Sequence, residues 1–129
     1  MNLKHIMVID DDKEDIEIFI EFISRCSYDV EVHFASECEE GLAVMRQLEN
    51  IDIVFIDCRM PEVSGLQVMR LMKADIELKS IPVVIMSSSH SKYDEEMVLL
   101  AGACSYMVKS TDHHDYCSEL YKVFGHCLN

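Results

Sequence analysis

The chain has 129 residues, half of them hydrophobic, which suits one domain around a single core and excludes an intrinsically disordered protein. Its formal net charge of −13 repels a nucleic-acid backbone, and its Lys and Arg residues form no cluster that would overcome this repulsion. The apolar runs are too short to span a bilayer and the first residues carry no signal-peptide pattern, so we expect a cytoplasmic protein that binds neither nucleic acid nor membrane.

The first part of the chain alternates between strand and helix patterns. Residues 6–9 form an apolar run that predicts a buried strand, and apolar residues then recur at helical spacing from Ile16 to Ile23. Residues 30–34 alternate apolar and polar side chains, which predicts a strand with one dry face. A second helical stripe covers residues 42–48. Residues 51–56 are almost entirely apolar and predict a third strand.

The second part continues the same alternation. Residues 64–72 predict a third helix, and residues 81–86 predict a fourth strand with a proline near its start, where the missing N–H matters least. An apolar stripe from Met97 to Ala101 indicates a fourth helix. Residues 104–108 predict a fifth strand, and apolar residues at helical spacing over 117–124 predict a last helix.

Five strands that alternate with five helices predict an α/β protein, a three-layer doubly wound (βα)5 fold of flavodoxin-like type with a five-stranded parallel sheet. The first, third and fourth strands are apolar on both faces, as central parallel strands are, whereas the second and fifth alternate, as edge strands can. This pattern predicts the strand order 2-1-3-4-5. We expect one domain over residues 1–129, with no output domain.

Acidic side chains follow two neighbouring strands of this predicted sheet. Asp10 and Asp11 come directly after the first strand, and Asp57 ends the third. Adjacent parallel strands lie about 4.8 Å apart, and three carboxylates at such range cannot all stay ionised without a cation. Oxygen ligands of this kind suit Mg²⁺. Ser87 ends the fourth strand and Lys109 ends the fifth, so a hydroxyl and an ammonium face the same crevice.

These residues resemble the receiver domains of two-component response regulators, and the resemblance covers essentially the whole chain. The Asp-x-x-Met-Pro-x-x-x-Gly run within "FIDCRMPEVSGL" is its most specific part. The other parts are the acidic pair Asp10-Asp11, Ser87 in "PVVIMSS", and "AGACSYMVK" with Tyr106 and Lys109. Each part alone is a weak signal, but all of them occur in order at the ends of the expected strands.

The resemblance implies a phosphorylation switch that contains Mg²⁺ and is not an enzyme. Asp57 would be the phosphoacceptor, taking its phosphoryl group from a phosphohistidine on a sensor histidine kinase or a histidine phosphotransfer protein. Asp11 would bind Mg²⁺ directly and Asp10 mainly through water, together with Asp57 and the backbone carbonyl of Arg59. The family's chemistry thus assigns a role to every acidic residue of the crevice except Asp12.

The resemblance also implies how the signal leaves the domain. Lys109 would neutralise the transferring phosphoryl group, Ser87 would hydrogen-bond the group once it is attached, and Tyr106 would move inward behind Ser87. The face made by the fourth helix, the fifth strand and the fifth helix would then bind a downstream protein or a second copy of the chain.

Three further expectations concern local structure. Asp12 is expected to cap the amino end of the first helix. Family members usually carry proline after the lysine in a cis peptide, whereas here Ser110 follows Lys109, so we expect a trans bond. Six cysteines show no C-x-x-C pair and are expected to be small reduced hydrophobic residues: Cys26, Cys38, Cys58, Cys104, Cys117 and Cys127.

Two alternative functions remain open from the sequence. A magnesium-dependent phosphatase that uses an aspartyl phosphate would share the sheet, but such enzymes need an acid two residues after the nucleophile, and that position is Arg59. A pseudo-receiver that acts as an adaptor without phosphorylation is the other alternative. The complete set of Asp57, Ser87 and Lys109 argues against it.

Overall fold

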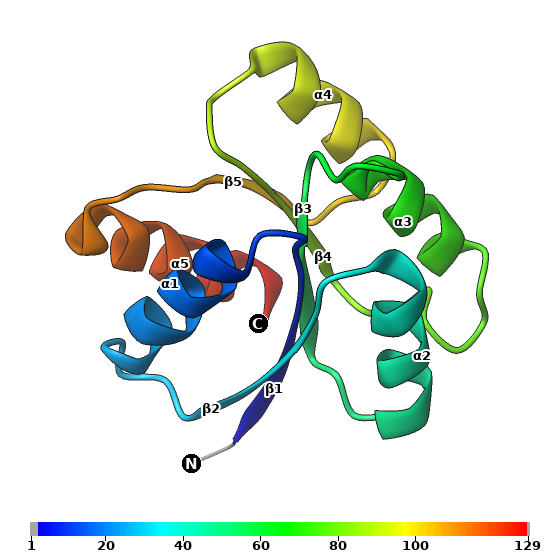
Figure 1. Ribbon diagram of the computed structural model, residues 1–129, viewed down its shortest axis with the longest axis horizontal. Coiled ribbons are helices and arrows are strands. Elements are labelled where there is room, and N and C mark those ends of the chain that lie inside the picture. Colours follow the sequence, from blue (N-terminus) through cyan, green and yellow to red (C-terminus); the bar gives the residue numbers. More distant parts are fainter. Residues whose placement is uncertain (1–2, 129) are drawn as a thin grey trace.

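The computed structural model describes residues 3–128, so residues 1, 2 and 129 of the predicted domain lie outside the described part (Figure 1). Strands and helices alternate along the chain. The strands are β1 (Lys4–Ile9), β2 (Val30–Ala35), β3 (Ile53–Asp57), β4 (Val83–Ser87) and β5 (Ser105–Val108). The helices are α1 (Lys13–Ser24), α2 (Cys38–Leu48), α3 (Gly65–Lys73), α4 (Lys92–Leu100) and α5 (His113–Cys127).

The five strands form one parallel sheet in the order β2-β1-β3-β4-β5, which confirms the predicted topology. Every residue of β3 and β4 is buried, whereas β2 and β5 lie at the edges and are only partly buried. The strand order reverses at β1, because β2 lies on one side of it and β3 to β5 lie on the other. Ligands of such sheets bind beyond the carboxyl ends of the strands at this point.

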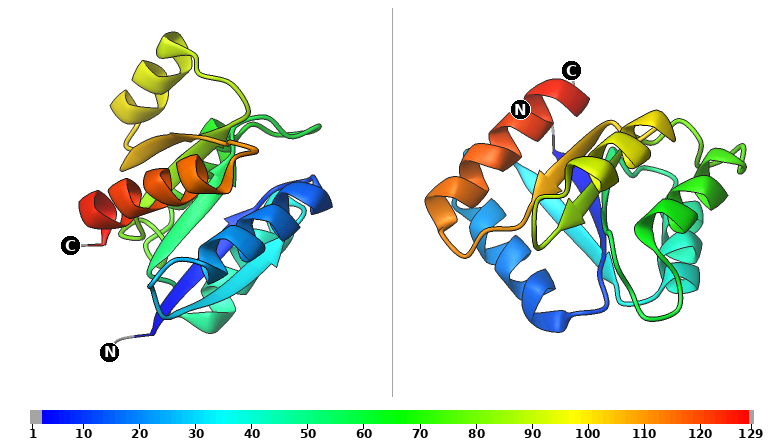
Figure 2. Two further views of the ribbon diagram at one scale, coloured as in Figure 1. Left: turned by 90° about the vertical axis from the view of Figure 1, so that its left-hand side faces the viewer. Right: turned by 90° about the horizontal axis from the view of Figure 1, so that it is seen from above.

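Helices cover both faces of the sheet, as the views in Figure 2 show. Successive residues of β1 point to opposite faces. Met7 and Ile9 therefore pack into a core with α2, α3 and α4, whereas Ile6 and Val8 pack into a second core with α1 and α5. Because both faces are dry, the polar side chains of the central strands can reach water only at the strand ends.

The second strand differs from the prediction of one dry face. Val30 and Val32 pack against the core on the side of α1 and α5, but Phe34 is 57% exposed. The sequence pattern showed which residues share a face but not how far the helices extend over it. Near the carboxyl end of this edge strand, Phe34 therefore faces solvent, whereas Ala35 on the opposite face is buried.

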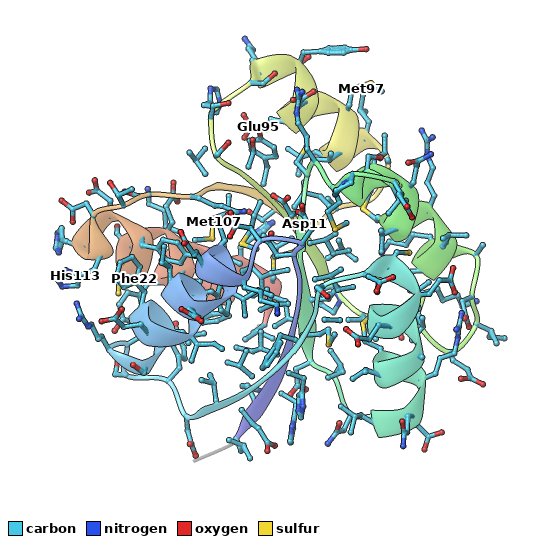
Figure 3. All side chains as sticks on the ribbon, viewed as in Figure 1. Asp11, Phe22, Glu95, Met97, Met107 and His113 are labelled. Atoms are coloured by element: carbon cyan, nitrogen blue, oxygen red, sulfur yellow. A yellow bond between two sulfur atoms is a disulfide. The ribbon has the colours of Figure 1, made fainter. Side chains whose placement is uncertain are left out.

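The fourth helix forms as predicted, but its buried position is not the predicted stripe. Val98 is buried, whereas Met97 is 38% and Leu100 is 87% exposed. Figure 3 shows Met97 beside α4 at the rim of the molecule. The helix lies on the sheet through a narrow contact, so most of its apolar side chains face solvent.

The expectation that all cysteines are reduced is wrong for two of them. Cys104 and Cys127 form a disulfide, with their Cα atoms 6.1 Å apart, which lies within the normal range for such bonds. Cys104 directly precedes β5 and Cys127 ends α5. Because α5 runs back along the sheet after β5, residues 23 positions apart meet, and no short sequence motif announces this contact. Cys26, Cys38, Cys58 and Cys117 are free thiols.

Two local predictions are confirmed. The Asp12 side chain caps α1 by accepting hydrogen bonds from the backbone N–H groups of Glu14 and Asp15. The peptide bond between Lys109 and Ser110 is trans.

Among residues 3–128, none of the helices is long and apolar enough to cross a membrane.

The contrast on α4 predicts that two substitutions change the stability by different amounts. Val98→Ala should lower the free energy of unfolding by about 1–3 kcal/mol, because it leaves a cavity in a packed core. Leu100→Ala should change it by less than about 0.5 kcal/mol, because the side chain already faces solvent. Urea unfolding followed by circular dichroism measures both. Equal losses in the two variants would contradict this description of the helix.

Candidate functional site

The fold brings the predicted acidic residues together at the carboxyl edge of the sheet. Asp10 follows β1 and is 1% exposed, Asp57 ends β3 and is 9% exposed, and Asp11 is open to solvent. One carboxylate oxygen of each lies within 4.8 Å of the others. Figure 3 shows Asp11 where β1 turns toward α1. Asp11 and Asp57 line a pocket of about 240 Å³, together with Ser87, Arg59 and Lys109.

The ammonium group of Lys109 lies at the centre of this acidic pocket. Its Nζ atom is 2.8 Å from Oδ2 of Asp10 and 3.0 Å from Oδ1 of Asp57. The backbone N–H of Lys109 donates to the carbonyl oxygen of Ser87 at 2.7 Å, so the end of β5 is fixed to the end of β4. The lysine is therefore held in place by both its backbone and its side chain.

Lys109 also contacts a third carboxylate, which was not predicted from the sequence. Oδ2 of Asp15 lies 2.8 Å from the Lys109 ammonium. Asp15 stands in the first turn of α1, directly after the acidic loop, and its backbone is fixed by the Asp12 cap. A signal for it was present, because a cap at Asp12 places the first turn of α1 at the same edge of the sheet.

Burial and the ammonium act on the carboxylates in opposite directions. Burial raises the pKa of Asp57 from 3.8 to about 6, although the hydrogen bond from Lys109 lowers it. Burial also raises the pKa of Asp10 against the same hydrogen bond. Burial lowers the pKa of Lys109, but its hydrogen bonds to Asp10 and Asp15 more than compensate, so the net pKa lies above the ordinary value. Lys109 therefore stays charged, while the carboxylates lack enough positive charge.

Ser87 lies in the same pocket, but its hydroxyl bonds within its own loop. Its Oγ atom donates to the carbonyl oxygen of Ser89 at 2.8 Å and accepts from the Ser89 N–H at 3.3 Å. Tyr106 on β5 is half-buried, and its hydroxyl donates to the same Ser89 carbonyl oxygen at 3.2 Å. Ser87 and Tyr106, which are predicted to move one after the other, therefore share the Ser89 carbonyl oxygen as their acceptor.

The loop after β3 presses closely on Asp57. Ser64 caps α3 through a reciprocal pair of hydrogen bonds with Gln67, and the N–H of Gly65 donates to the Cys58 carbonyl oxygen at 3.0 Å. A Cβ atom at Gly65 would lie 2.6 Å from the backbone carbonyl oxygen of Asp57. Only glycine fits here without moving the backbone of the acidic residue.

Arg59 lines the pocket from the same loop. Its side chain is 85% exposed and pairs with Oδ2 of Asp94 at 3.5 Å, outside the acidic group. The guanidinium therefore adds nothing to the partial compensation of the pocket's negative charge by Lys109. This arrangement is compatible with the predicted role of Arg59, which involves its backbone carbonyl and not its side chain.

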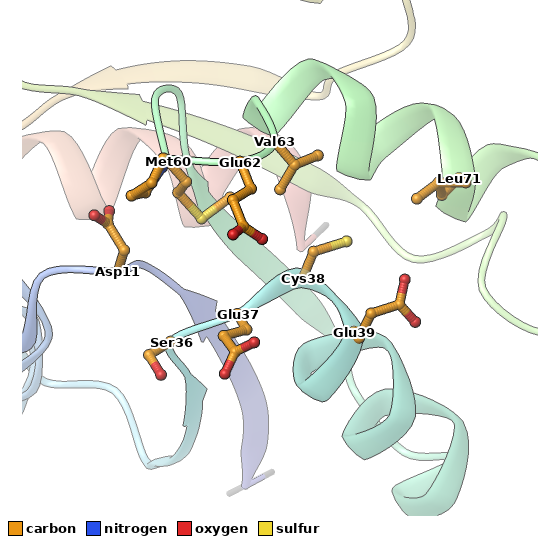
Figure 4. A pocket seen from close by; sticks show the side chains of 10 residues that line it. Asp11, Ser36, Glu37, Cys38, Glu39, Met60, Glu62, Val63 and Leu71 are labelled. Atoms are coloured by element: carbon orange, nitrogen blue, oxygen red, sulfur yellow. The ribbon is translucent and has the colours of Figure 1, made fainter.

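A larger groove of about 440 Å³ adjoins Asp11 on the side of the loops before α2 and α3 (Figure 4). Met60, Pro61, Val63 and Leu71 give it an apolar wall. Three glutamates and Asp11 make its remaining surface acidic: Glu37, Glu39 and Glu62 are the glutamates. Figure 4 shows the Asp11 carboxylate at one end of this groove, so Asp11 is reached from solvent on two sides.

Similarity to known proteins agrees with the fold and with the residues of the pocket. Residues 6–121 match the family described as response regulator receiver domain. The chain belongs to this family. It is 31% identical over 106 residues to the polar-differentiation response regulator DivK of Brucella ovis, which covers 82% of this chain and 84% of that protein. The chain is thus a receiver of two-component signalling.

Solved receiver structures have the same fold. The phosphorylated cyanobacterial phytochrome response regulator RcpA superposes with a TM-score of 0.83 at 25% identity, covering 99% of this chain and 96% of that one. The chemotaxis protein CheY4 of Vibrio cholerae gives a TM-score of 0.78 at 20% identity, covering 95% and 99%. The family and the flavodoxin-like fold predicted from the sequence are therefore both confirmed.

Because the pKa of Asp57 is raised, ionisation of its carboxyl should destabilise the folded protein, and the loss of stability should depend on pH. Its pKa is 3.8 when unfolded and about 6 when folded, so the stability it contributes is present below pH 4 and is lost as the pH rises through 6. Without divalent metal, Asp57→Asn should therefore stabilise this receiver at pH 7.5 by on the order of 2 kcal/mol. The gain should shrink toward zero near pH 4.

Thermal melts in EDTA across this pH range measure the effect. Glu62→Gln removes the same charge from an exposed position of the neighbouring loop and serves as the control. An equal gain in both variants would show that net charge alone, and not the burial of Asp57, is responsible.

Proposed function

We propose that this receiver takes a phosphoryl group onto Asp57 from a phosphohistidine of a sensor histidine kinase or a histidine phosphotransfer protein. The carrying observation is that Asp57 ends a central strand in a solvent-reachable pocket, 3.0 Å from the Lys109 ammonium. One carboxylate oxygen forms a bond to phosphorus while the phosphorus–nitrogen bond of the phosphohistidine breaks. The electron pair stays on the imidazole nitrogen, which takes up a proton, and the product is an acyl phosphate.

The donor set of the pocket fits Mg²⁺. Asp10, Asp11 and Asp57 offer three carboxylates against the single ammonium of Lys109, and Mg²⁺ prefers oxygen ligands and keeps several waters. In the proposal, Asp11 and Asp57 bind the ion directly, Asp10 binds it mainly through water, and the Arg59 backbone carbonyl supplies a further oxygen. The bound ion would offset the negative charge of the transferring phosphoryl oxygens.

Lys109 has two tasks in this proposal. Before transfer, its ammonium holds the Asp57 carboxylate against Asp10 and Asp15, so that the nucleophilic oxygen has a defined position. During transfer, the same ammonium contacts the phosphoryl oxygens and stabilises the charge that spreads over them. A side chain that is only 12% exposed has little freedom to leave this position.

The shared acceptor supports a mechanical link from the phosphoryl group to the surface. A phosphoryl group on Asp57 would offer the Ser87 hydroxyl a charged acceptor, which is stronger than the neutral Ser89 carbonyl. Ser87 would then release Ser89, and the loop that holds the Tyr106 hydroxyl would move with it. Tyr106 would turn inward into the space that is vacated.

The output of this switch would be the surface formed by α4, β5 and α5. Tyr106 lies on β5, an edge strand, and edge strands are open to pairing with other proteins. We propose that this surface binds a downstream protein or a second copy of the chain, that residues 1–129 form one receiver domain, and that the protein works in the cytoplasm.

The alternatives receive less support. A phosphatase of the aspartyl-phosphate type would need an acid at position 59, where Arg59 instead pairs with Asp94 at the surface. A pseudo-receiver would not need an ammonium held by three carboxylates beside Asp57. That RcpA, 25% identical, has been crystallised in its phosphorylated form also favours phosphorylation.

The proposal predicts one phosphorylation site. Incubation with a small-molecule phosphodonor and Mg²⁺ should add one phosphoryl group, detected by intact mass, and hydroxylamine should remove it as expected for an acyl phosphate. Asp57→Asn should give no adduct. EDTA, or Asp11→Asn, should slow the reaction by at least tenfold, because a metal ligand is lost.

Asp12→Asn is the matched control, since it removes one charge from the same loop while asparagine still caps α1. It should be phosphorylated at close to the wild-type rate. An adduct that persists in Asp57→Asn would overturn the assignment, and a wild-type protein that never reacts, even with a cognate histidine kinase, would favour the pseudo-receiver.

The link through Ser89 predicts where the structure changes. Beryllofluoride, a phosphoryl mimic, should shift backbone amide resonances mainly in residues 87–110, with smaller shifts into α5. Asp57→Asn should show none of them. Shifts that stay within the loops around Asp10 and Asp57 would mean that the phosphoryl group does not reach the proposed output surface.

A further inference from the structure

A second group of potential metal ligands lies at the other end of β1 from the acidic pocket. It consists of His5 on β1 and of Glu31 and His33 on β2. In the parallel register His5 pairs with Glu31, and His33 stands two residues further along the same strand. Residues two apart in a strand point to the same face, so all three side chains rise from one side of the sheet.

The three donor atoms already converge without a metal. Nδ1 of His5 lies 3.1 Å from Oε2 of Glu31 and 3.4 Å from Nε2 of His33. The third side of this triangle, from Nε2 of His33 to Oε2 of Glu31, measures 3.9 Å. Two imidazole nitrogens and one carboxylate oxygen therefore form a triangle with all sides between 3.1 and 3.9 Å.

These separations bracket the ligand spacing of a tetrahedral Zn²⁺ site. With metal–nitrogen bonds of about 2.0–2.1 Å and metal–oxygen bonds of about 2.0–2.2 Å, ligand atoms at the corners of a tetrahedron lie about 3.3–3.5 Å apart. Small side-chain rotations would bring all three donors to this spacing. Mg²⁺ and Ca²⁺ prefer oxygen ligands, so a set of two imidazoles and one carboxylate selects first-row transition metals instead.

The backbone beneath this group is fixed. The N–H of His5 donates to Oδ2 of Asp52 at 2.8 Å, and the N–H of Asp52 donates back to the His5 carbonyl oxygen at 2.8 Å. This pair of hydrogen bonds ties the start of β1 to the segment that leads into β3. A site on paired strands keeps its ligand spacing better than one on loops.

The group is also open enough to take up an ion. The His5 and His33 side chains are 20% and 23% exposed, and the Glu31 side chain is 54% exposed. A fourth ligand position can therefore be filled by water. The net charge of −13 further raises the local concentration of cations.

We propose that His5, Glu31 and His33 bind one Zn²⁺ ion, with water as the fourth ligand, at a site separate from the acidic pocket. His5 and Asp10 are five residues apart along an extended strand and the loop that follows it, so the two sites are roughly 16 Å apart. The ion would cross-link the edge strand β2 to β1. Binding only to the folded protein, it would raise the stability of the domain.

Titration with Co²⁺, in buffer with millimolar Mg²⁺, tests this site. Tetrahedral Co²⁺ absorbs visible light strongly, and nitrogen and oxygen ligands give no thiolate charge-transfer band, which separates this site from the cysteines. We expect one Co²⁺ per chain, displaced by one Zn²⁺, and a melting temperature that rises with Zn²⁺. His33→Gln and Glu31→Gln should each weaken binding more than tenfold.

Two controls make the result specific. His90→Gln disrupts another histidine–glutamate pair, in which His90 and Glu95 lie 3.0 Å apart, and should leave Co²⁺ binding unchanged. Asp11→Asn should also leave it unchanged, because that residue belongs to the acidic pocket. Wild-type affinity in either His33→Gln or Glu31→Gln, or a weak six-coordinate spectrum in the wild type, would overturn the proposal. Glu31 is exposed, so its variant tests the site without disturbing the fold.

Discussion

The ammonium of Lys109 binds carboxylates from three separate segments: Asp10 after β1, Asp15 in α1 and Asp57 at the end of β3. Asp10 and Asp57 are buried, and buried carboxylates without a positive partner would strongly destabilise the folded state. The lysine makes this arrangement possible but does not neutralise it fully. The remaining negative charge makes the pocket receptive to a further cation. Burial, with a smaller contribution from the charges of Asp10 and Asp11, raises the pKa of Asp57 and keeps its carboxyl hard to ionise.

The rest of the fold explains why these groups meet where they do. The central strands are buried on both faces by two separate cores, so polar side chains are confined to the strand ends. The Lys109 N–H bonds to the Ser87 carbonyl, which ties the ends of β4 and β5 together, and the Ser89 carbonyl accepts from both Ser87 and Tyr106. A change at the carboxyl edge therefore has a short covalent and hydrogen-bonded route to β5.

The sequence predicted those features that depend on local pattern. The strand order followed from which apolar runs are buried on both faces, and the positions of Asp10, Asp57, Ser87 and Lys109 followed from the strand ends. Features that depend on how helices lie against the sheet were not predicted. The exposure of Phe34 and Leu100, and the disulfide between Cys104 and Cys127, require knowledge of where helices extend and where α5 ends.

Asp15 and Gly65 differ in how far the sequence could have predicted their place in the site. Asp15 was within reach of the sequence, since its helix begins beside the acidic loop, but its contact with Lys109 depends on a side-chain direction. Gly65 appeared only as part of a family motif. Its physical reason, the closeness of the Asp57 carbonyl oxygen, is visible only when α3 is docked on the sheet.

Gly65 also limits how this protein can change during evolution. A single-base mutation from glycine can reach alanine, serine or another residue with a Cβ atom, and each would press on the Asp57 backbone. Selection on Asp57 therefore acts on a second codon eight positions away, although that residue has no side chain to take part in any chemistry. Lineages that lose the phosphoacceptor would be freed from this restriction, so drift at position 65 should accompany or follow loss of the aspartate.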